Sequence, residues 1–359
     1  MEKKALPKIG IEQIWLFQFL KRRILRFSRW YNLNIITARQ SRSRLSFLLE
    51  EIMDEKVLHS LLMEKVGRKF YGHKILKSKY IPQIPQGAER EYIRMVRAYM
   101  GLLKNELEET LPELKESYKK NRDESVRYDA DTDIMLKVNE LFTKMKSELL
   151  QKTVGFGLRR KLENLAKLNR KLTVKEWKKA IKATLGIDIF EDYYMGEFFK
   201  ENLLKWAIDN VELISTIPDE TLDKMKEIVF EGYSNGRTTT RMVKDIQRAY
   251  KVGLNHARLI ARDQTAKLNG QIQKAQQQDA GINRYIWCTS GDERVRESHK
   301  AMNGKMFSWD IPPTNSDGRA CHPGEDFQCR CIGRPVFDRD TLSLPVDESV
   351  NVKITKKYP

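Results

Sequence analysis

The sequence predicts an α+β protein, with a mostly α-helical, elongated N-terminal body and a small α+β C-terminal domain. Apolar residues recur at every third or fourth position through most of the chain, which is the period of amphipathic helices. At Arg284 this period changes, and the run RYIWCTS is rich in the aromatic and β-branched residues that favour strands. A chain of 359 residues is also longer than one hydrophobic core usually serves, so we expect more than one domain.

Boundaries between regions are predicted from breaks in the helical pattern and from proline. Pro82 and Pro85 interrupt regular structure in a basic segment, 68–86, which we expect to be a linker or an extended arm. The expected organisation is a basic helical N-terminal region with a proline-containing arm (1–85), a helical body (86–250), an α+β domain (251–340) and a polar tail (341–359).

Helix positions follow from periodicity, capping residues and glycines. Pro112 either kinks the helix around it or starts a new one, and the GFG run at 155–157 ends a helix. Thr173 and Glu176 have the spacing of a capping box, so we expect them to open a helix that Gly186 ends. The predicted helices span 11–30, 46–66, 88–118, 131–150, 173–186, 194–212, 218–232, 238–250 and 254–280.

The net charge of +17 indicates an acidic partner such as nucleic acid. Two segments, 21–44 and 68–80, interleave cations with aromatic residues, which is typical of surfaces that contact nucleic acid without reading its sequence. A solvated face, or a docking surface for an acidic protein, is the alternative. The candidate DNA-contacting residues are Lys21, Arg22, Arg23, Arg26, Lys69, Lys74 and Lys77.

Hydropathy gives no reason to expect membrane insertion, because no apolar run approaches the roughly 18 residues that span a bilayer. The apolar run IWLFQFL at 14–20 is short and leads into three basic residues instead of a small-residue cleavage site, so we do not expect a signal peptide. We therefore expect a protein that is made and kept in a cytoplasm. There, clustered cysteines are more often metal ligands or buried thiols than disulfides.

The stretch 285–331 concentrates the residues that carry chemistry, since it holds all four cysteines and two of the five histidines. A turn after the predicted strand leads into an expected helix, capped by Asp292, that carries Arg294, Arg296 and His299. Arg296 and His299 are three residues apart and would share a face. Such a cluster can perform acid–base or phosphate chemistry. The interpretation we favour is structural, with Asp292 pinning the helix to the sheet through an arginine.

A metal site is the second hypothesis for this stretch. His322, Cys329 and Cys331 lie within ten residues, and His299 or Cys321 could supply a fourth ligand. Imidazole and thiolate suit tetrahedral zinc, which would stabilise a stretch too rich in Gly, Pro and Asp to build much core. The Cys-x-Cys spacing differs from the usual Cys-x2-Cys, so reduced, buried thiols are the alternative. No signature of a nucleophilic cysteine surrounds these residues.

Three ordered motifs give a specific resemblance. They are ARLIARDQTAKLNG at 257–270, YIWCTSGDERVRESHKAMNGKMFSW at 285–309 and HPGEDFQCRC at 322–331. Together they resemble the phage head morphogenesis family, which includes the minor head proteins similar to Mu protein F and to SPP1 gene product 7. The resemblance extends from about Ala257 to Pro335, with weaker similarity in the helical segment that begins near residue 200. Residues 1–190 show no such resemblance.

The resemblance implies a non-catalytic, minor structural protein of a tailed-phage head. Such a protein is bound to the portal protein inside the head, assembles in the cytoplasm of the bacterial host, and acts in procapsid assembly and DNA ejection. Packaged double-stranded DNA, and scaffold or major capsid protein, are further expected partners. A metal-dependent nuclease or related hydrolase that uses the His- and Cys-rich site is the alternative.

Carried over residue by residue, the family's polar motif implies a set of site residues. The motif falls on Asp292, Arg294, Arg296, His299, Gly304, His322, Pro323, Cys329, Arg330 and Cys331. Cys288 and Cys321 lie outside it. If a structural zinc is present, the resemblance therefore implies His299, His322, Cys329 and Cys331 as its ligands.

Overall fold

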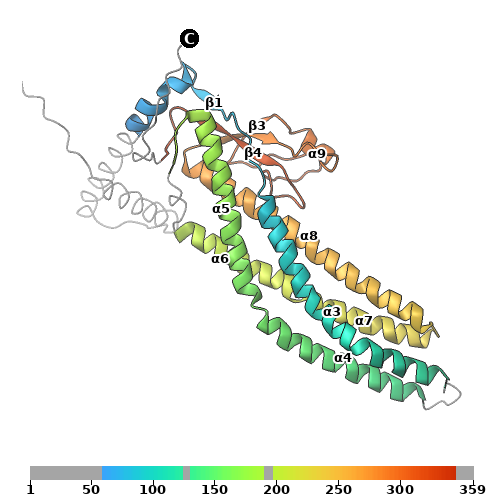
Figure 1. Cartoon of the computed structure of the whole chain (residues 1–359). Coiled ribbons are helices and arrows are strands. Elements are labelled where there is room, and N and C mark those ends of the chain that lie inside the picture. Colours follow the sequence, from blue (N-terminus) through green and yellow to red (C-terminus); the bar gives the residue numbers. More distant parts are fainter. Residues whose placement is uncertain (1–58, 124–129, 190–196, 345–359) are drawn as a thin grey trace, which may run out of the picture.

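The computed structural model describes residues 59–123, 130–189 and 197–344, and it confirms the predicted α+β class. Long helices form an elongated body, and a small sheet lies at one end of it (Figure 1). A helix over 59–70 precedes the first strand. The elements that follow are β1 (Ile75–Lys77), α3 (Gln86–Asp123), α4 (Ala130–Gly155), α5 (Leu158–Leu185), α6 (Glu197–Ser215), α7 (Ile217–Ser234), α8 (Thr239–Asp279), β2 (Arg284–Cys288), α9 (Glu297–Lys300), β3 (Met306–Ser308) and β4 (Ile332–Asp338).

Two long helices, α3 and α8, run side by side through the body. They contain 38 and 41 residues, which corresponds to about 57 and 62 Å at 1.5 Å per residue. Helices α4 and α7 pack against them far from the sheet, whereas α5 and α6 pack against them near it (Figure 1). Within the described ranges, no helix combines the length and the apolar character that crossing a bilayer requires.

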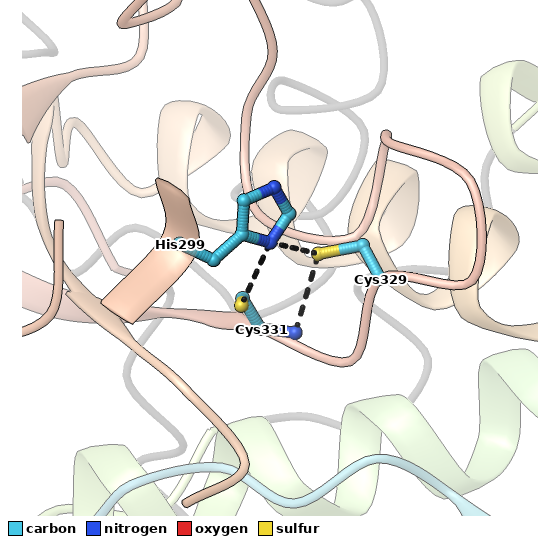
Figure 2. A group of neighbouring side chains, drawn as sticks. All are labelled: His299, Cys329 and Cys331. Atoms are coloured by element: carbon cyan, nitrogen blue, oxygen red, sulfur yellow. Dashed lines mark hydrogen bonds between the residues drawn. The ribbon is translucent and has the colours of Figure 1, made fainter. Parts of the chain in front are cut away.

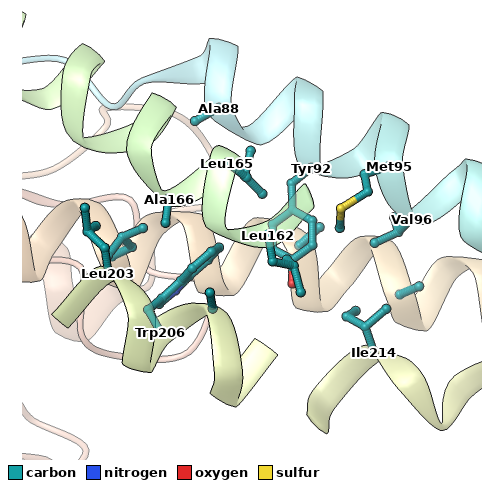
Figure 3. Packing of buried hydrophobic residues seen from close by; sticks show 14 of the residues in the cluster. Ala88, Tyr92, Met95, Val96, Leu162, Leu165, Ala166, Leu203, Trp206 and Ile214 are labelled. Atoms are coloured by element: carbon teal, nitrogen blue, oxygen red, sulfur yellow. The ribbon is translucent and has the colours of Figure 1, made fainter. Parts of the chain in front are cut away.

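The body's core is built from the apolar stripes of these helices. Figure 3 shows Tyr92 of α3, Leu162 of α5 and Trp206 of α6 meeting in this core. Tyr92 is fully buried, and its hydroxyl donates to Asn210 Oδ1 at 2.7 Å, so its polar atom is satisfied. The ring of Tyr92 meets that of Trp206 edge-on, with the centroids 5.8 Å apart. Aromatic packing of this kind joins α3 and α6.

Two predicted helix boundaries are wrong, and packing explains both. Thr173 lies inside α5, where its hydroxyl donates to the Asn169 carbonyl at 2.9 Å and does not cap a helix. The segments predicted as separate helices around Gly253 form the single helix α8. A Cβ at Gly253 would lie 2.3 Å from Thr221 Oγ1, so this glycine serves close packing against α7 and does not end the helix.

Other predicted boundaries are confirmed. The α4 helix ends at Gly155, and both Gly157 and Gly186 adopt the left-handed conformation at the two ends of α5. Helix α3 continues through Pro112 without a break. The predicted helix at 11–30 and most of the one at 46–66 lie outside the described residues.

The sheet is antiparallel, with strand order β1-β4-β2-β3. The proline-containing arm supplies its edge strand, since Ile75 pairs with Asp338 and Lys77 with Val336. The expected strand at 284–290 forms as β2 and pairs with both β3 and β4. Residues more than 250 positions apart in the chain therefore share one sheet.

A buried glutamine fastens the sheet to α8. Gln277 Nε2 donates to the Gly333 carbonyl of β4 at 2.7 Å, and Gln277 Oε1 accepts from Trp309 Nε1 at 2.9 Å. A Cβ at Gly333 would lie 2.6 Å from the Trp309 ring, so only glycine lets the indole cross the strand. Farther along β4, Phe337 stacks on Trp177 of α5. The sheet is thus held by both α8 and α5.

The arm that follows β1 is tied to α5 by one carboxylate. Glu176 Oε2 accepts from the Tyr80 hydroxyl at 2.5 Å and from the Gln83 amide at 3.1 Å. Burial raises the pKa of Glu176, but Lys179, Tyr80 and the Gln83 amide together outweigh burial, so the net pKa is lowered. The carboxylate form of Glu176 is therefore the one that stabilises the fold.

We predict that Glu176→Gln lowers the free energy of unfolding by about 1–2 kcal/mol at pH 7, because the charge-assisted hydrogen bonds become neutral ones. A lowered pKa in the folded state adds stability above the unfolded value of about 4.3, and this stability is lost as the pH falls through the folded value. The difference from wild type in urea unfolding should therefore shrink below about pH 4. Glu163→Gln, on the exposed side of the same helix, is the control and should change stability by less than about 0.5 kcal/mol. A pH-independent deficit would contradict this account.

Candidate functional site

The loops between β2 and β4 build a second, smaller core beside the helical body. They pack on the sheet around two tryptophans and three cysteines. The buried members of this core are Tyr285, Trp287, Met302, Trp309, Cys321, Cys329 and Cys331. The stretch singled out from the sequence thus folds as one compact unit.

This unit docks on α8 through two close contacts. Gly270 of α8 faces Gly324, and a Cβ on Gly270 would lie 2.8 Å from the Pro323 carbonyl oxygen. Asp263 of α8 accepts a hydrogen bond from the backbone amide of Gln328 at 2.7 Å. One turn earlier in α8, the Leu259 carbonyl accepts from the side chain of Gln328. Because Gln328 has a positive φ of 54°, this hydrogen bond helps to hold a backbone conformation that side chains disfavour. The helix motif and the cysteine motif are therefore two halves of one interface.

A buried imidazole and two buried thiols meet at the centre of the unit. His299 lies on α9, Cys329 lies near the end of the loop between β3 and β4, and Cys331 directly precedes β4. His299 Nδ1 lies 3.6 Å from Cys329 Sγ and 3.5 Å from Cys331 Sγ (Figure 2). The three side chains are 2–4% exposed. We call them the His299 cluster.

Electrostatics in the His299 cluster favour one thiolate. The pKa of Cys329 is lowered well below its usual value, first by the Cys331 thiol and then, against the cost of burial, by His299 and two backbone amides. Those amides, of Gly324 and Cys331, each lie 3.4 Å from Cys329 Sγ. The pKa of Cys331 is raised, because its thiol donates to Cys329, and the pKa of His299 is raised, chiefly by its hydrogen bond to Cys329.

A carboxylate backs the imidazole on its other side. His299 Nε2 lies 3.2 Å from Asp326 Oδ2. Asp326 accepts hydrogen bonds from Arg296 at 2.7 Å, from Arg319 at 3.0 Å and from the Phe327 amide at 2.8 Å. Burial raises the pKa of Asp326, but the Phe327 amide and the two arginines outweigh burial and lower it. Asp326 was not singled out from the sequence, because nothing in its spacing distinguishes it from its acidic neighbours.

The polar motif residues are braced by one another. Asp292 pairs with Arg330, and its Oδ1 accepts the Arg294 amide at 3.2 Å. The predicted helix is shorter than expected: it covers only Glu297–Lys300, and Arg296 is its N-terminal flanking residue. Arg296 and His299 converge on Asp326 all the same. The turn at Gly304 has a φ of 79°, which glycine adopts freely.

The structure does not bring His322 into the His299 cluster. Its Nδ1 lies 3.0 Å from the Tyr285 hydroxyl, and its ring packs against Trp309 at a centroid distance of 5.1 Å. Cys321 instead lies within 4.8 Å of ligand atoms of both His299 and Asp326. Burial raises the pKa of Cys321 to about 11. His322 is close to the cysteines in sequence, but the turn at 323–325 follows it and its side chain lies against Tyr285 and Trp309 instead.

A cavity of about 240 Å³ opens beside the cluster. All three cluster residues line it, together with the carboxylate Glu89 of α3 and several arginines. These arginines are Arg262, Arg294, Arg296 and Arg330. Arg262 pairs with Glu89 at 3.4 Å, so the wall is basic but partly neutralised.

The predicted DNA-contacting residues fall into two groups. Lys21, Arg22, Arg23 and Arg26 lie outside the described residues. Lys69, Lys74 and Lys77 are exposed. Lys74 pairs with Asp340 at 2.8 Å, which reduces its availability for phosphate.

A basic face on α5 was missed in the sequence analysis. Helix α5 carries ten Lys or Arg residues and two acids. Six of the basic residues follow helical spacing on one face and are exposed, apart from the half-buried Lys178. We call this set the α5 basic stripe: Arg160, Lys167, Lys171, Lys175, Lys178 and Lys182. The basic residues of the stripe recur at steps of three, four or seven positions, which the sequence alone shows. Lysine is so frequent throughout this chain that the pattern was not recognised.

Comparison with known proteins confirms the predicted resemblance. The sequence model of the family described as phage Mu protein F like protein matches residues 223–333. A protein of Haemophilus influenzae, described as uncharacterized, is 29% identical over 252 residues, which cover 69% of this chain and 53% of the relative. The chain thus matches about half the length of that relative. No solved structure matches.

The docking interface gives a direct test. We predict that Gly270→Ala lowers the free energy of unfolding by about 1–2 kcal/mol, because overpacking against the Pro323 carbonyl outweighs the gain in helix propensity. Gly101→Ala, at a position of α3 where a Cβ would meet nothing within 4 Å, is the matched control. It should be neutral or stabilising by up to about 1 kcal/mol. Urea unfolding of both variants makes the comparison, and equal effects would contradict the interface.

Proposed function

We propose, from the match of residues 223–333 to phage Mu protein F like proteins, that this chain is a minor structural protein of a tailed-phage head. In this proposal it binds the portal protein, takes part in procapsid assembly and genome delivery, and contacts packaged DNA without sequence preference. The observation that carries the proposal is that the matched motifs form one braced unit docked on α8. Such a unit suits a rigid docking module.

The α5 basic stripe supports the contact with DNA. Lys182 lies 22 positions after Arg160, or about 33 Å along the helix. Duplex DNA carries one negative charge per about 1.7 Å of its axis, so a row of lysines can follow its phosphates. Lys69, whose Nζ lies near Gly186, extends the basic surface past the end of α5. We infer nonspecific binding, because lysines act here as point charges on phosphate.

Exposed apolar side chains on the docked unit support contact with another head protein. Ile311 is 74% exposed and Phe327 is 50% exposed, although both lie in loops braced by the second core. Exposed apolar residues on a rigid loop suit a protein interface. We assign the portal protein as this partner, with scaffold or major capsid protein as the next candidates.

The rival interpretation, a metal-dependent nuclease or hydrolase, has weaker support. General acid–base catalysis requires a carboxylate or imidazole that is free to exchange a proton with a substrate. Asp292 is held by Arg330, and Asp326 is held by Arg296 and Arg319. These carboxylates are committed to structural pairs, which favours the non-catalytic role.

For the DNA contact, we predict that the variant Lys167→Gln/Lys171→Gln/Lys175→Gln binds random-sequence duplex DNA more weakly than wild type. Fluorescence anisotropy at several salt concentrations should show a shallower dependence of log K on log salt, by up to about 2.7, since each phosphate contact contributes about 0.9. The control Lys224→Gln/Lys244→Gln/Lys251→Gln removes the same charge from exposed positions on α7 and α8. It should keep the wild-type slope. Equal loss in both variants would show that the contact is not on α5.

For the portal contact, the full chain is co-expressed with the portal and capsid proteins of the same phage genome, and procapsids are purified. We predict that the chain is incorporated and co-purifies with portal oligomers. Phe327→Asp, which places a charge in the proposed interface, should reduce incorporation at least about tenfold, equivalent to about 1.4 kcal/mol. Leu150→Asp, at an exposed position on α4, is the control. Absence of the wild-type chain from procapsids would overturn the proposal.

A further inference from the structure

We propose that the His299 cluster binds one zinc ion through His299 Nδ1, Cys329 Sγ and Cys331 Sγ. The ion would join α9, the loop that docks on α8, and the start of β4 (Figure 2). This proposal does not depend on the role in head assembly, because it rests on the geometry and chemistry of the cluster alone.

The two nitrogen-to-sulfur distances in the cluster match the corresponding edges of a zinc tetrahedron. With Zn–S near 2.3 Å and Zn–N near 2.0–2.1 Å, tetrahedral geometry separates nitrogen from sulfur by about 3.5 Å and the two sulfurs by about 3.8 Å. The observed separations from His299 Nδ1 are 3.6 Å to Cys329 and 3.5 Å to Cys331. All three ligand atoms lie within 4.8 Å of one another. A zinc ion fits with only small side-chain adjustments.

The chemistry of the cluster also suits zinc. Both cysteines are buried and free, and two backbone amides point at Cys329 Sγ, an arrangement that stabilises a thiolate. Two thiols side by side in a buried site cannot both ionise without a cation, because their charges repel each other. Zinc removes that obstacle, since it binds deprotonated thiolates and supplies two positive charges. Sulfur and imidazole in tetrahedral arrangement favour zinc over the harder cations.

Asp326 has the position of a second-shell partner to the ligand histidine. Nδ1 of His299 lies next to the sulfurs, and Nε2 lies 3.2 Å from Asp326 Oδ2, close enough for a small rotation of the ring to align a hydrogen bond. A carboxylate on the remote nitrogen of a metal-bound histidine orients the ring and raises its basicity. Arg296 and Arg319 hold the carboxylate in place. Asp326 is therefore assigned as a positioning residue, not as a ligand.

The cavity beside the cluster supplies both a route and a fourth ligand. All three proposed ligands line it, so an ion can reach the site without unfolding of the loop. Water or a small anion from this cavity would complete the coordination of the ion. Cys321, which lies with His299 and Asp326, is left outside the ligand set.

The test is metal analysis of the full chain. The protein is purified without chelators or metal-affinity steps, incubated with zinc sulfate and dialysed, and bound zinc is measured by mass spectrometry. We expect one zinc per chain in wild type, and loss of stoichiometric zinc in Cys329→Ser, Cys331→Ser and His299→Ala. Cys288→Ser and Cys321→Ser, which remove cysteines outside the proposed ligands, should each retain one zinc. Wild-type protein without zinc, or a ligand variant that keeps it, would overturn the assignment.

Two further measurements separate metal binding from folding. Asp326→Asn should weaken zinc affinity by about 10–100-fold while one zinc still binds at saturation, as expected for a partner of the ligand histidine.

Cobalt-loaded wild type should show a tetrahedral visible spectrum with a sulfur-to-cobalt charge-transfer band. The cobalt spectrum is recorded on the wild-type protein, so it tests the proposal even where a cysteine variant fails to fold. A cobalt spectrum without that band would overturn thiolate ligation. DNA binding and incorporation into procapsids are measured separately, so the zinc site can fail while the proposed function stands.

Discussion

The C-terminal unit depends on how closely its loop can approach α8. Gly270 and Gly324 bring the two backbones together, and Asp263 accepts the amide of Gln328, whose φ is positive. If the loop stood farther from the helix, Cys329 would not reach His299 and Asp326 would lose its place beside the imidazole. A contact between two glycines thus positions most of the polar chemistry in the protein.

The same helix, α8, connects the C-terminal unit to the rest of the body. Gln277, near the C-terminal end of α8, holds both Gly333 of β4 and Trp309, while the N-terminal half of α8 packs on α7 through Gly253. Helix α3 runs beside it along the body, and α5 packs on both. The sheet, the second core and the helical bundle therefore share α8 as a common support. A continuous helix suits this purpose better than the two separate helices that its sequence predicts.

The candidate site was only partly predictable from the sequence. Cys329 and Cys331 were identified as candidate ligands, with His299 or Cys321 as a further one, and the choice of His299 came from the family resemblance. His322 was grouped with them by proximity in sequence, yet its ring turns toward Tyr285 and Trp309. Asp326 could not be identified, because its role depends on the distance to a histidine 27 positions earlier. The distance between Asp326 and His299 depends on how the chain that follows β3 folds back toward α9. No local sequence pattern encodes that path.

By itself the sequence determined the α+β class, the long helices and the resemblance of the C-terminal region to phage Mu protein F like proteins. These follow from local periodicity, from glycine breaks such as the GFG run at 155–157, and from motifs that are short and ordered. Only the tertiary structure decided that β1 joins β4, that Gly253 lies within a helix and that the imidazole of His299 meets the thiols of Cys329 and Cys331. Each of these depends on contacts between residues distant in the chain, and such contacts are chosen by packing and by burial of polar groups, not by local propensity.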